Sequence, residues 1–165
     1  MQPLLREIRP GDNQRIAFII RKALEEHGVA RPGTVYTDPT TDDLFALFQK
    51  KGSAYFVIEL NGEIVGGCGV YPTSGLPEGC AELVKLYTDK SIRGRGFGAL
   101  LMNRSAQAAK ALGYKQLYLE TLPELGNAVS LYERMGYQNL KAALGDSGHF
   151  ACSIWMLKSL EGTNS

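Results

Sequence analysis

The sequence predicts an α/β domain built on a mixed, largely antiparallel sheet that is flanked by helices. Three observations support this class. Strand-like runs stand at both ends of the chain with helical runs between them, which is the order of a mixed domain. Two apolar runs are joined by Asn61-Gly62, the pattern of a tight hairpin. The 165 residues, 44% of them hydrophobic, suit a single core, so we expect one domain over residues 1–160 and a short flexible tail over 161–165.

The chain opens with a predicted strand and helix. Residues 4–9, LLREIR, alternate apolar and charged side chains as a half-buried strand does. Pro10-Gly11 ends this run. Asp12 is then expected to cap a helix that ends near Glu26, because apolar residues recur along one helical face of this segment.

A turn-rich, irregular segment over 27–40 leads to a second short helix over 42–51. The hairpin follows, with strands over 54–60 and 63–71. Its two-residue connection, Asn61-Gly62, is favoured because both central residues of such a turn take positive φ.

The second half of the chain alternates strands and helices. After the turn-rich residues 74–79, the run AELVKLYT over 81–88 predicts a third sheet strand. The remaining predicted elements are a helix over 96–112, a strand over 115–121, a helix over 127–135, and terminal strands over 137–140 and 150–157.

The loop between the strand over 81–88 and the next helix has the sequence RGRGFG, from Arg93 to Gly98. Glycines let the backbone turn sharply and bring its N–H groups close to a ligand. Unpaired N–H groups at the start of a helix, together with the helix dipole, favour a phosphate. The loop therefore predicts a phosphate-binding site.

One interpretation of this loop is a dinucleotide fingerprint. Gly94, Gly96 and Ala99 satisfy G-x-G-x-x-G/A, and Glu120 ends the next strand where a ribose-binding acid would stand. In that fingerprint the strand runs directly into the first glycine. Here TDKSIR intervenes, and three strands precede the motif, which leaves too little chain for a doubly wound fold. The pattern therefore disfavours a nicotinamide or flavin site.

A second interpretation fits more of the chain. Arg93-x-x-Gly96-x-Gly98 resembles the R/Q-x-x-G-x-G/A signature of the GCN5-related N-acetyltransferases (GNAT). AELVKLYTDKSIRGRGFGALLM resembles motif A of that family, and LYLETLPELGNAVSLYERMGYQ resembles its motif B. Together these stretches cover roughly residues 80–140. The resemblance implies a GNAT-like fold and an acetyl-CoA-dependent N-acetyltransferase.

The resemblance also implies that three segments hold acetyl-CoA as the donor substrate. Backbone groups of Leu86, Tyr87 and Thr88 would pair with the pantetheine arm almost as with an added strand, and an N–H there would hold the developing oxyanion. Asn127, which the sequence also predicts as an N-cap, would contact the same arm. The loop residues whose amides would take the pyrophosphate are Arg93, Gly94, Arg95, Gly96, Phe97 and Gly98. The side chains of Arg93 and Arg95 are candidates for added charge, with a solvated Arg95 as the alternative.

Two residues are candidates for the chemistry. Tyr132 matches the family tyrosine beside the CoA sulfur, where a phenol can protonate a leaving thiolate whose pKa is about 8.5. Glu82 occupies the place of the catalytic glutamate of GCN5-type histone acetyltransferases, and burial in a sheet would raise its pKa toward neutrality, which suits a base. A second role is open for Glu82, that of binding the acceptor ammonium. Glu120, Glu124 and Tyr118 are alternative candidates.

Histidines and cysteines give fewer indications. His149, in the loop before the last strand, is a candidate for contacting substrate or relaying a proton, with a structural hydrogen bond as the alternative. His27 is expected near a helix end in solvent. No metal site is expected, because the chain has only two histidines and they stand far apart in the sequence. The three cysteines, which we expect to be reduced and mostly buried, are Cys68, Cys80 and Cys152.

The predicted reaction is transfer of acetyl from acetyl-CoA to a primary amine of a small molecule or amino acid, by direct attack in a ternary complex. No cysteine matches a family nucleophile, so a covalent acyl-enzyme is not expected. Two alternatives are a protein or peptide acceptor and a non-catalytic acyl-CoA sensor. The segments expected to choose the acceptor are 30–43, 72–79 and 144–149.

Charge and hydropathy limit the other partners. The formal net charge is +1, and no basic tract stands out, so no nucleic-acid partner is expected. No apolar run approaches the length of a membrane span and the N-terminus lacks the apolar core of a signal peptide, so we expect no membrane partner and a cytoplasmic location. The terminal strands would allow a homodimer.

Overall fold

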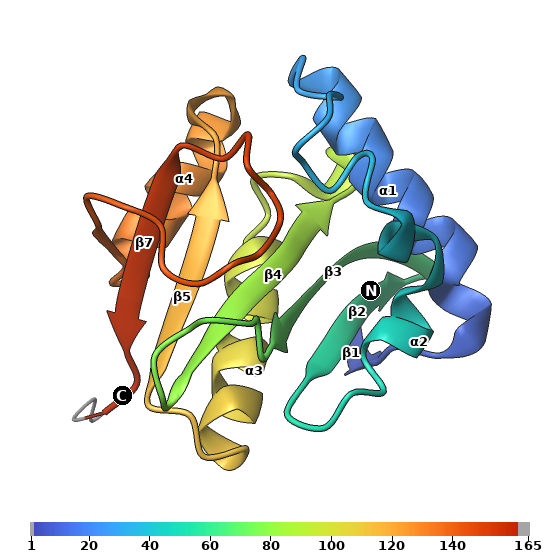
Figure 1. Cartoon of the computed structure of the whole chain (residues 1–165). Helices are drawn as coiled ribbons and strands as arrows, with labels where there is room; N and C mark the ends of the chain where they lie inside the picture. The colour runs from blue at the N-terminus through green and yellow to red at the C-terminus, as the bar shows by residue number, and fades with distance from the viewer. Residues whose placement is uncertain (1, 162–165) are drawn as a thin grey trace.

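A computed structural model describes residues 2–161, and these form one seven-stranded sheet in the order β1-β2-β3-β4-β5-β7-β6 (Figure 1). All neighbouring strands are antiparallel except β4 and β5, which run parallel. The predicted mixed, largely antiparallel sheet is therefore confirmed. Apart from its first residue, the predicted tail over 161–165 lies outside the described residues. The strands are β1 (Leu4–Glu7), β2 (Ala54–Leu60), β3 (Glu63–Tyr71), β4 (Cys80–Thr88), β5 (Gln116–Thr121), β6 (Gln138–Asn139) and β7 (Ile154–Ser159).

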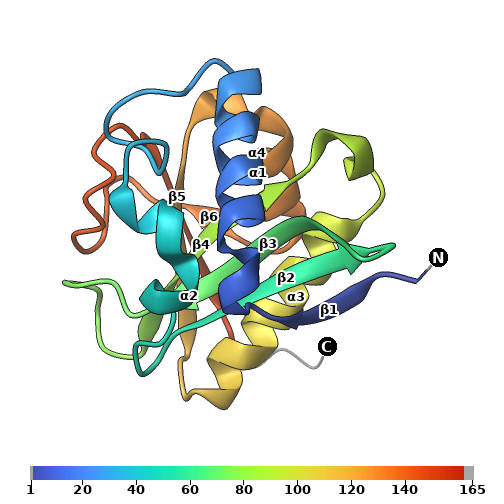
Figure 2. The same cartoon turned by 90° about the vertical axis from the view of Figure 1, so that its right-hand side faces the viewer.

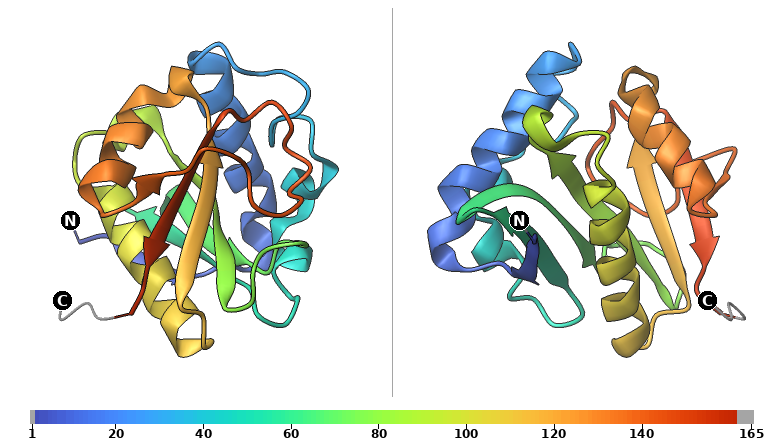
Figure 3. Two further views of the ribbon diagram at one scale, coloured as in Figure 1. Left: turned by 60° about the vertical axis from the view of Figure 1, so that its left-hand side comes forward. Right: turned by 180° about the vertical axis from the view of Figure 1, so that it is seen from behind.

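Helices cover both faces of the sheet. They are α1 (Asn13–Glu26), α2 (Leu44–Leu47), α3 (Phe97–Ala111) and α4 (Gly126–Arg134). Figure 2 shows α1 and α2 on one face, and the rear view in Figure 3 shows α3 and α4 on the other. Each layer encloses its own cluster of buried apolar side chains. Within residues 2–161, none of the helices is both long and apolar enough to cross a membrane.

The hairpin of β2 and β3 forms as the sequence predicts. Leu60 pairs with Glu63, so the connection is the two-residue turn Asn61-Gly62. Both turn residues have positive φ, 56° and 82°. Asn and Gly are the residues that adopt this conformation at least cost, which explains why this dipeptide fixes the register of the hairpin.

A β-bulge in β4 interrupts its pairing with β3. The register shifts between Gly67 and Gly69, so Lys85 and Leu86 stand opposite Cys68 alone. Lys85 takes φ 53°, in the left-handed region that side chains other than Asn, Asp and Gly rarely occupy. An extra residue of this kind bends the strand and re-aims its side chains.

Tyr55 of β2 holds this bulge in place from across β3. Its hydroxyl donates a buried 2.8 Å hydrogen bond to the carbonyl of Lys85. The ring needs the space above two glycines of β3, since a Cβ would meet ring atoms at 2.6 Å from Gly67 and 2.7 Å from Gly69. The glycine-rich sequence of β3 is therefore a requirement for the bulge in β4.

Beyond Glu82, β4 and β5 separate. Their parallel pairing is confined to Cys80–Glu82 opposite Gln116–Tyr118. Figure 1 shows the two strands side by side at one end of the sheet and apart at the other, while β5 stays paired with β7 along its whole length. The sheet consequently opens between its two central strands.

Two predicted details of the N-terminal half are wrong. Asp12 stands at the N-cap position of α1, and the helix ends at Glu26 as predicted, but the Asp12 side chain does not cap the helix, because its carboxylate accepts bonds from the Arg9 N–H and from the Arg6 guanidinium. The helix predicted over 42–51 is a 3-10 turn, Pro39–Asp43, followed by the single turn of α2. Asp38 and Asp43 each accept a backbone N–H there, which starts two short elements in place of one helix.

The C-terminal strands also differ from the prediction. The last strand, expected over 150–157, is β7 at Ile154–Ser159, and the strand expected over 137–140 keeps only the two residues of β6. Residues 150–153 instead belong to a loop, in which Ala151 bonds the Gly33 carbonyl and Cys152 bonds the His149 carbonyl. Because their backbone groups make these loop contacts, the strand begins at Ile154 and not at residue 150.

Gly67→Ala tests whether β3 must leave room for Tyr55, because the three atoms nearest to a Cβ at this position all belong to the Tyr55 side chain, at 2.6 to 2.9 Å. We expect the free energy of unfolding to fall by about 2 kcal/mol, the usual cost of overpacking a buried site. Urea unfolding measures this change. Gly11→Ala is the matched control, because its Cβ would meet nothing within 4 Å and its φ is not left-handed. Equal unfolding midpoints for the two variants would contradict the requirement.

Candidate active site

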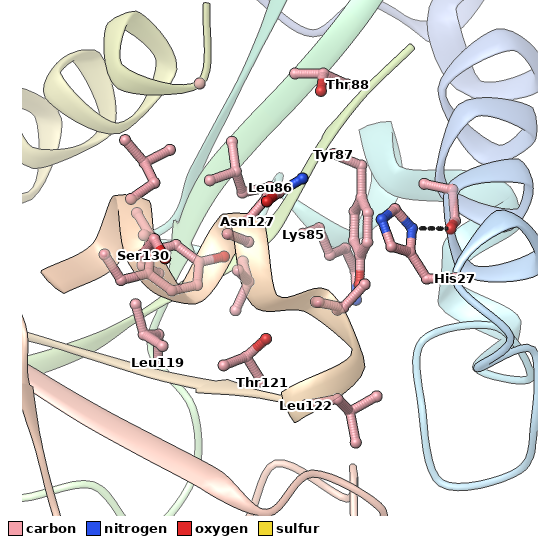
Figure 4. A pocket seen from close by; sticks show the side chains of 18 of the residues that line it. His27, Lys85, Leu86, Tyr87, Thr88, Leu119, Thr121, Leu122, Asn127 and Ser130 are labelled. Carbon is pink, nitrogen blue, oxygen red and sulfur yellow. Dashed lines mark hydrogen bonds between the residues drawn. The ribbon is translucent and has the colours of Figure 1, made fainter. Parts of the chain in front are cut away.

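A cavity of about 720 Å³ occupies the gap between β4 and β5. Figure 4 shows the labelled side chains that line it: Lys85, Leu86 and Tyr87 come from β4, Leu119 and Thr121 from β5, and Asn127 and Ser130 from α4. The start of α3 and the end of α1 complete the lining. The cavity thus draws on every element around the opening of the sheet.

The edge of β4 is open along this cavity. Leu86, Tyr87 and Thr88 all line it, and on the side that faces β5 the strand has no partner beyond Glu82. Backbone N–H and C=O groups left open in this way can pair with an amide-bearing ligand. The structure thus places the three predicted strand residues where a ligand can add to the sheet.

The glycine loop adds a run of unused donors at the end of the cavity. Among residues 2–161, no acceptor bonds the backbone N–H of Gly94, Arg95 or Gly96. Gly96 stands at the N-cap of α3 with φ 83°, and no side chain caps that helix. The next N–H groups, those of Phe97 and Gly98, belong to the first turn, which has no intrahelical acceptors. These successive donors fit a pyrophosphate.

The two arginine side chains of the loop point elsewhere. The Arg93 guanidinium donates to the Thr88 carbonyl, at 2.9 and 3.2 Å, and forms an ion pair with Glu26 at 2.9 Å. Arg95 is exposed, with its guanidinium 5.3 Å from the centre of the Phe97 ring. Arg93 therefore braces the loop against β4 and α1, and the donors that face the cavity are backbone groups.

Asn127 is not the N-cap that the sequence predicts. A 3-10 turn, Pro123–Leu125, runs directly into α4, so the helix begins at Gly126 and its N-cap position is Leu125. Asn127 lies in the first turn and lines the cavity (Figure 4). Its amide is therefore available to a ligand.

Tyr132 projects from α4 into the buried wall of the cavity. Only 7% of the residue is exposed, and its ring meets the Tyr137 ring edge-on at 6.1 Å. Among the described residues its hydroxyl has no hydrogen-bond partner. Burial raises the pKa of Tyr132 above its usual value, so the phenol keeps its proton across the neutral range.

Glu82 lies on β4 at the point where the two strands part. It is 4% exposed, and its pKa is raised to about 7. Burial is the main cause and the charge of Glu120 adds to it, whereas a 2.6 Å bond from the Thr73 hydroxyl and the charge of Lys85 oppose the shift. A carboxylate with a pKa near neutrality can accept and release a proton under physiological conditions.

Glu120 and His149 lie beside Glu82. One ligand atom from each of the three residues lies within 4.8 Å of the others. Glu120 accepts bonds from the hydroxyls of Tyr118 and Ser147. Both oxygens of Glu120 therefore accept a hydroxyl group, whereas only Oε1 of Glu82 does, from Thr73. Among the described residues, Glu82 is thus the carboxylate that keeps one oxygen open to a proton. Glu124, the remaining acidic candidate, is exposed and pairs with Arg31.

Sequence reasoning missed two residues of this cluster, Lys85 and Asp38. Asp38 accepts a bond from His149 Nε2 at 3.1 Å, and its carboxylate lies 3.9 Å from Lys85 Nζ. These interactions and two bonds from Thr40 lower the pKa of Asp38 to about 2, against the effect of burial. The one available signal is that Lys85 is the only cation in an otherwise apolar run of β4.

The three segments expected to choose the acceptor meet over this end of the cavity. The Ala151 N–H bonds the Gly33 carbonyl at 3.1 Å, and the Asp146 N–H bonds the Ser74 carbonyl at 2.7 Å. An ion pair between Arg31 and Glu124 ties the first segment to the end of β5. The loops thus form a roof above Glu82.

The structure also shows where His27 and the three cysteines lie. His27 is half-buried and lines the cavity, with Nδ1 2.8 Å from the Ala23 carbonyl, so the expectation of a solvent position is wrong. Cys68 and Cys80 are buried and Cys152 is half-buried, all with free thiols, as the sequence predicts.

Comparison with known proteins agrees with this architecture. The model of the Acetyltransferase (GNAT) family matches residues 18–137. An uncharacterized N-acetyltransferase of Escherichia coli strain K12, YjgM, is 38% identical over 159 residues, which are 96% of this chain and 95% of the relative.

Solved structures show the same fold. A GNAT-family acetyltransferase from Staphylococcus aureus Mu50 superposes with a TM-score of 0.82 at 17% identity, over 97% of this chain and all of the other. The PaiA N-acetyltransferase of Thermoplasma acidophilum, solved in complex with coenzyme A, superposes with a TM-score of 0.75 at 14% identity, over 96% of this chain and 99% of the other. The open β4 edge, the uncapped glycine loop and these matches lead to one conclusion: the chain belongs to the GNAT family of acetyltransferases.

Proposed function

We propose that this chain transfers the acetyl group of acetyl-CoA to the primary amine of a small molecule by direct attack in a ternary complex. One observation carries the proposal. A single cavity joins the unused donors of the glycine loop to the open edge of β4, and then to Glu82 and Tyr132. A donor with a pyrophosphate at one end and a thioester at the other fits the order of these groups along the cavity.

Binding of the donor is assigned to backbone groups. The amides of residues 94–98 would hold the pyrophosphate, and the β4 edge at Leu86 to Thr88 would pair with the pantetheine arm, with Asn127 on its other side. The Arg93 side chain contributes by shaping the loop, because it is engaged with Thr88 and Glu26. Acetyl-CoA supplies the acetyl group as an activated thioester.

The proton transfers are assigned to Glu82 and Tyr132. An ammonium group must lose a proton to become a nucleophile, and Glu82, with a pKa of about 7, can take that proton. The amine nitrogen then bonds to the acetyl carbon as the carbon–sulfur bond breaks. Tyr132 keeps its proton at neutral pH and can donate it to the departing sulfur. The departing CoA thiolate would lie against the same buried wall, where desolvation raises the pKa of the thiol and so favours its protonation.

A protein acceptor and a non-catalytic role are the two alternatives. A protein acceptor would need an open approach to Glu82, whereas the roof over this end is tied by backbone bonds at Gly33 and Ser74. This closure favours a small acceptor. A non-catalytic acyl-CoA sensor would need neither a carboxylate with a pKa near neutrality nor a free phenol in the cavity.

Thiol release from acetyl-CoA tests the proposed function. The full chain is incubated with acetyl-CoA and a panel of primary amines, with a thiol-reactive dye for free CoA and mass spectrometry for the acetylated amine. We expect amine-dependent release with one acetylated product per thiol. CoA binding in calorimetry without release for any amine would support the sensor instead.

Tyr132→Phe tests the role of the phenol. Loss of a general acid lowers kcat by about 100-fold, while uniform binding of the donor is retained, so CoA affinity should change by less than about threefold. Steady-state kinetics and calorimetry measure the two quantities. Tyr137→Phe is the matched control, because Tyr137 is equally buried and packs on Tyr132 but does not line the cavity. Unchanged turnover in Tyr132→Phe would remove the phenol from the mechanism.

Glu82→Gln tests the base through the pH profile. In the native protein kcat/KM should fall as the pH drops below about 7, because protonation of Glu82 removes the base. The variant should lose this inflection and about 100-fold in rate at pH 7, and should recover rate at alkaline pH as free amine accumulates.

Glu133→Gln serves as an exposed control on α4. If Glu82→Gln raises only the KM for the acceptor and keeps the inflection, Glu82 binds the ammonium and is not the base.

A further inference from the structure

We propose that Lys85 binds a carboxylate of the acceptor, so that the acceptors of this protein are amino acids, with the amine at Glu82 and the carboxylate at Lys85. This inference rests on the proposed function and names the substrate class of the same site. It assigns to Lys85 the role of a specificity-determining residue.

The bulge brings Lys85 to the same side of the sheet as Glu82. Residues three apart in a regular strand point to opposite faces. The extra residue at Lys85, with φ 53°, resets this alternation, and Nζ reaches Asp38 on the α1 side of the sheet. Glu82 and Lys85 lie close enough for each to shift the pKa of the other, and both line the cavity. One strand thus presents an anion and a cation to the same space.

The ammonium group of Lys85 has donors to spare. Its side chain is only 4% exposed, and its nearest carboxylate, that of Asp38, lies 3.9 Å away, beyond hydrogen-bond length. Within residues 2–161, Lys85 Nζ makes no hydrogen bond. A lysine carries three N–H donors, and a buried charge without bonds is costly. A carboxylate arriving in the cavity would satisfy these donors.

Asp38 maintains the charge of Lys85 without occupying its donors. Its oxygens accept bonds from Thr40 N at 2.9 Å, Thr40 Oγ1 at 2.7 Å and His149 Nε2 at 3.1 Å. The Asp38 carboxylate is therefore already bonded, and its charge opposes the lowering of the Lys85 pKa that burial causes. An amine without a carboxylate would find partners at Glu82 and Glu120 but would leave Lys85 unbonded.

Matched acceptors test the inference on the unaltered protein. The thiol-release assay compares glycine, L-alanine, L-serine and L-methionine with their carboxamides. Amidation lowers the pKa of the amine and so favours its free form, which means that a preference for the acid must come from the carboxylate. We expect kcat/KM to be higher for the acids by about tenfold or more, the effect of one charge-assisted hydrogen bond.

Lys85→Met tests the assigned residue. Methionine keeps the length of the side chain and removes a buried charge. The KM for the acids should rise by about tenfold or more relative to the KM for the carboxamides. Loss of the Lys85 charge also raises the pKa of Glu82, but this effect is common to both series and cancels in the ratio. Lys51→Met, in an exposed turn, is the control for the loss of one positive charge. Lys85→Gln provides a second variant should Lys85→Met fold poorly.

Three results would overturn the inference, and they are distinguishable. Carboxamides used as well as acids by the native protein would show that no carboxylate is recognised. Equal losses for both series in Lys85→Met and Lys85→Gln would place Lys85 in the chemistry or in the folding of β4 instead. Thiol release with other amines but with neither series would overturn this inference alone, whereas release with no amine would overturn the proposed function as well.

Discussion

The Tyr55 hydroxyl reaches across β3 to the Lys85 carbonyl, and this buried hydrogen bond holds β4 in its bulged form. The reach is possible only because Gly67 and Gly69 carry no side chain beneath the ring. From the bulge follow the separation of β4 from β5, the open strand edge, and the cavity between them. A regular β4 could continue its pairing with β5, which would leave no opening in the middle of the sheet.

The same bulge sets the electrostatics of the site. It presents Lys85 to the space that Glu82 faces, where Asp38 lies 3.9 Å from Lys85 Nζ and accepts a bond from His149. Glu82 keeps a pKa of about 7 because burial and Glu120 favour its protonated form more than Lys85 opposes it. The cation with open donors thus arises from one distortion of one strand, whereas the raised pKa of the base arises from its burial and from Glu120.

The sequence predicts those parts of the molecule that depend on local pattern. The hairpin at Asn61-Gly62 follows from turn chemistry, and the glycine loop follows from the needs of a helix start. The prediction of Asn127 as the N-cap was wrong because a 3-10 turn, Pro123–Leu125, runs directly into α4, so that the helix begins one residue earlier, at Gly126. The bulge could not be predicted, since it depends on Tyr55 meeting Lys85 across 30 positions of sequence. Asp38 was missed for the same reason, because its loop meets β4 only in the folded chain.

The proposed function requires that coenzyme A binds in the gap between β4 and β5. A crystal structure of the full chain with coenzyme A tests this most directly. We expect the pyrophosphate on the amides of residues 94–98, the pantetheine arm along the β4 edge at Leu86 to Thr88, and the sulfur beside the Tyr132 hydroxyl. Coenzyme A bound outside the gap, or a β4 that pairs with β5 beyond Glu82 in the complex, would contradict it.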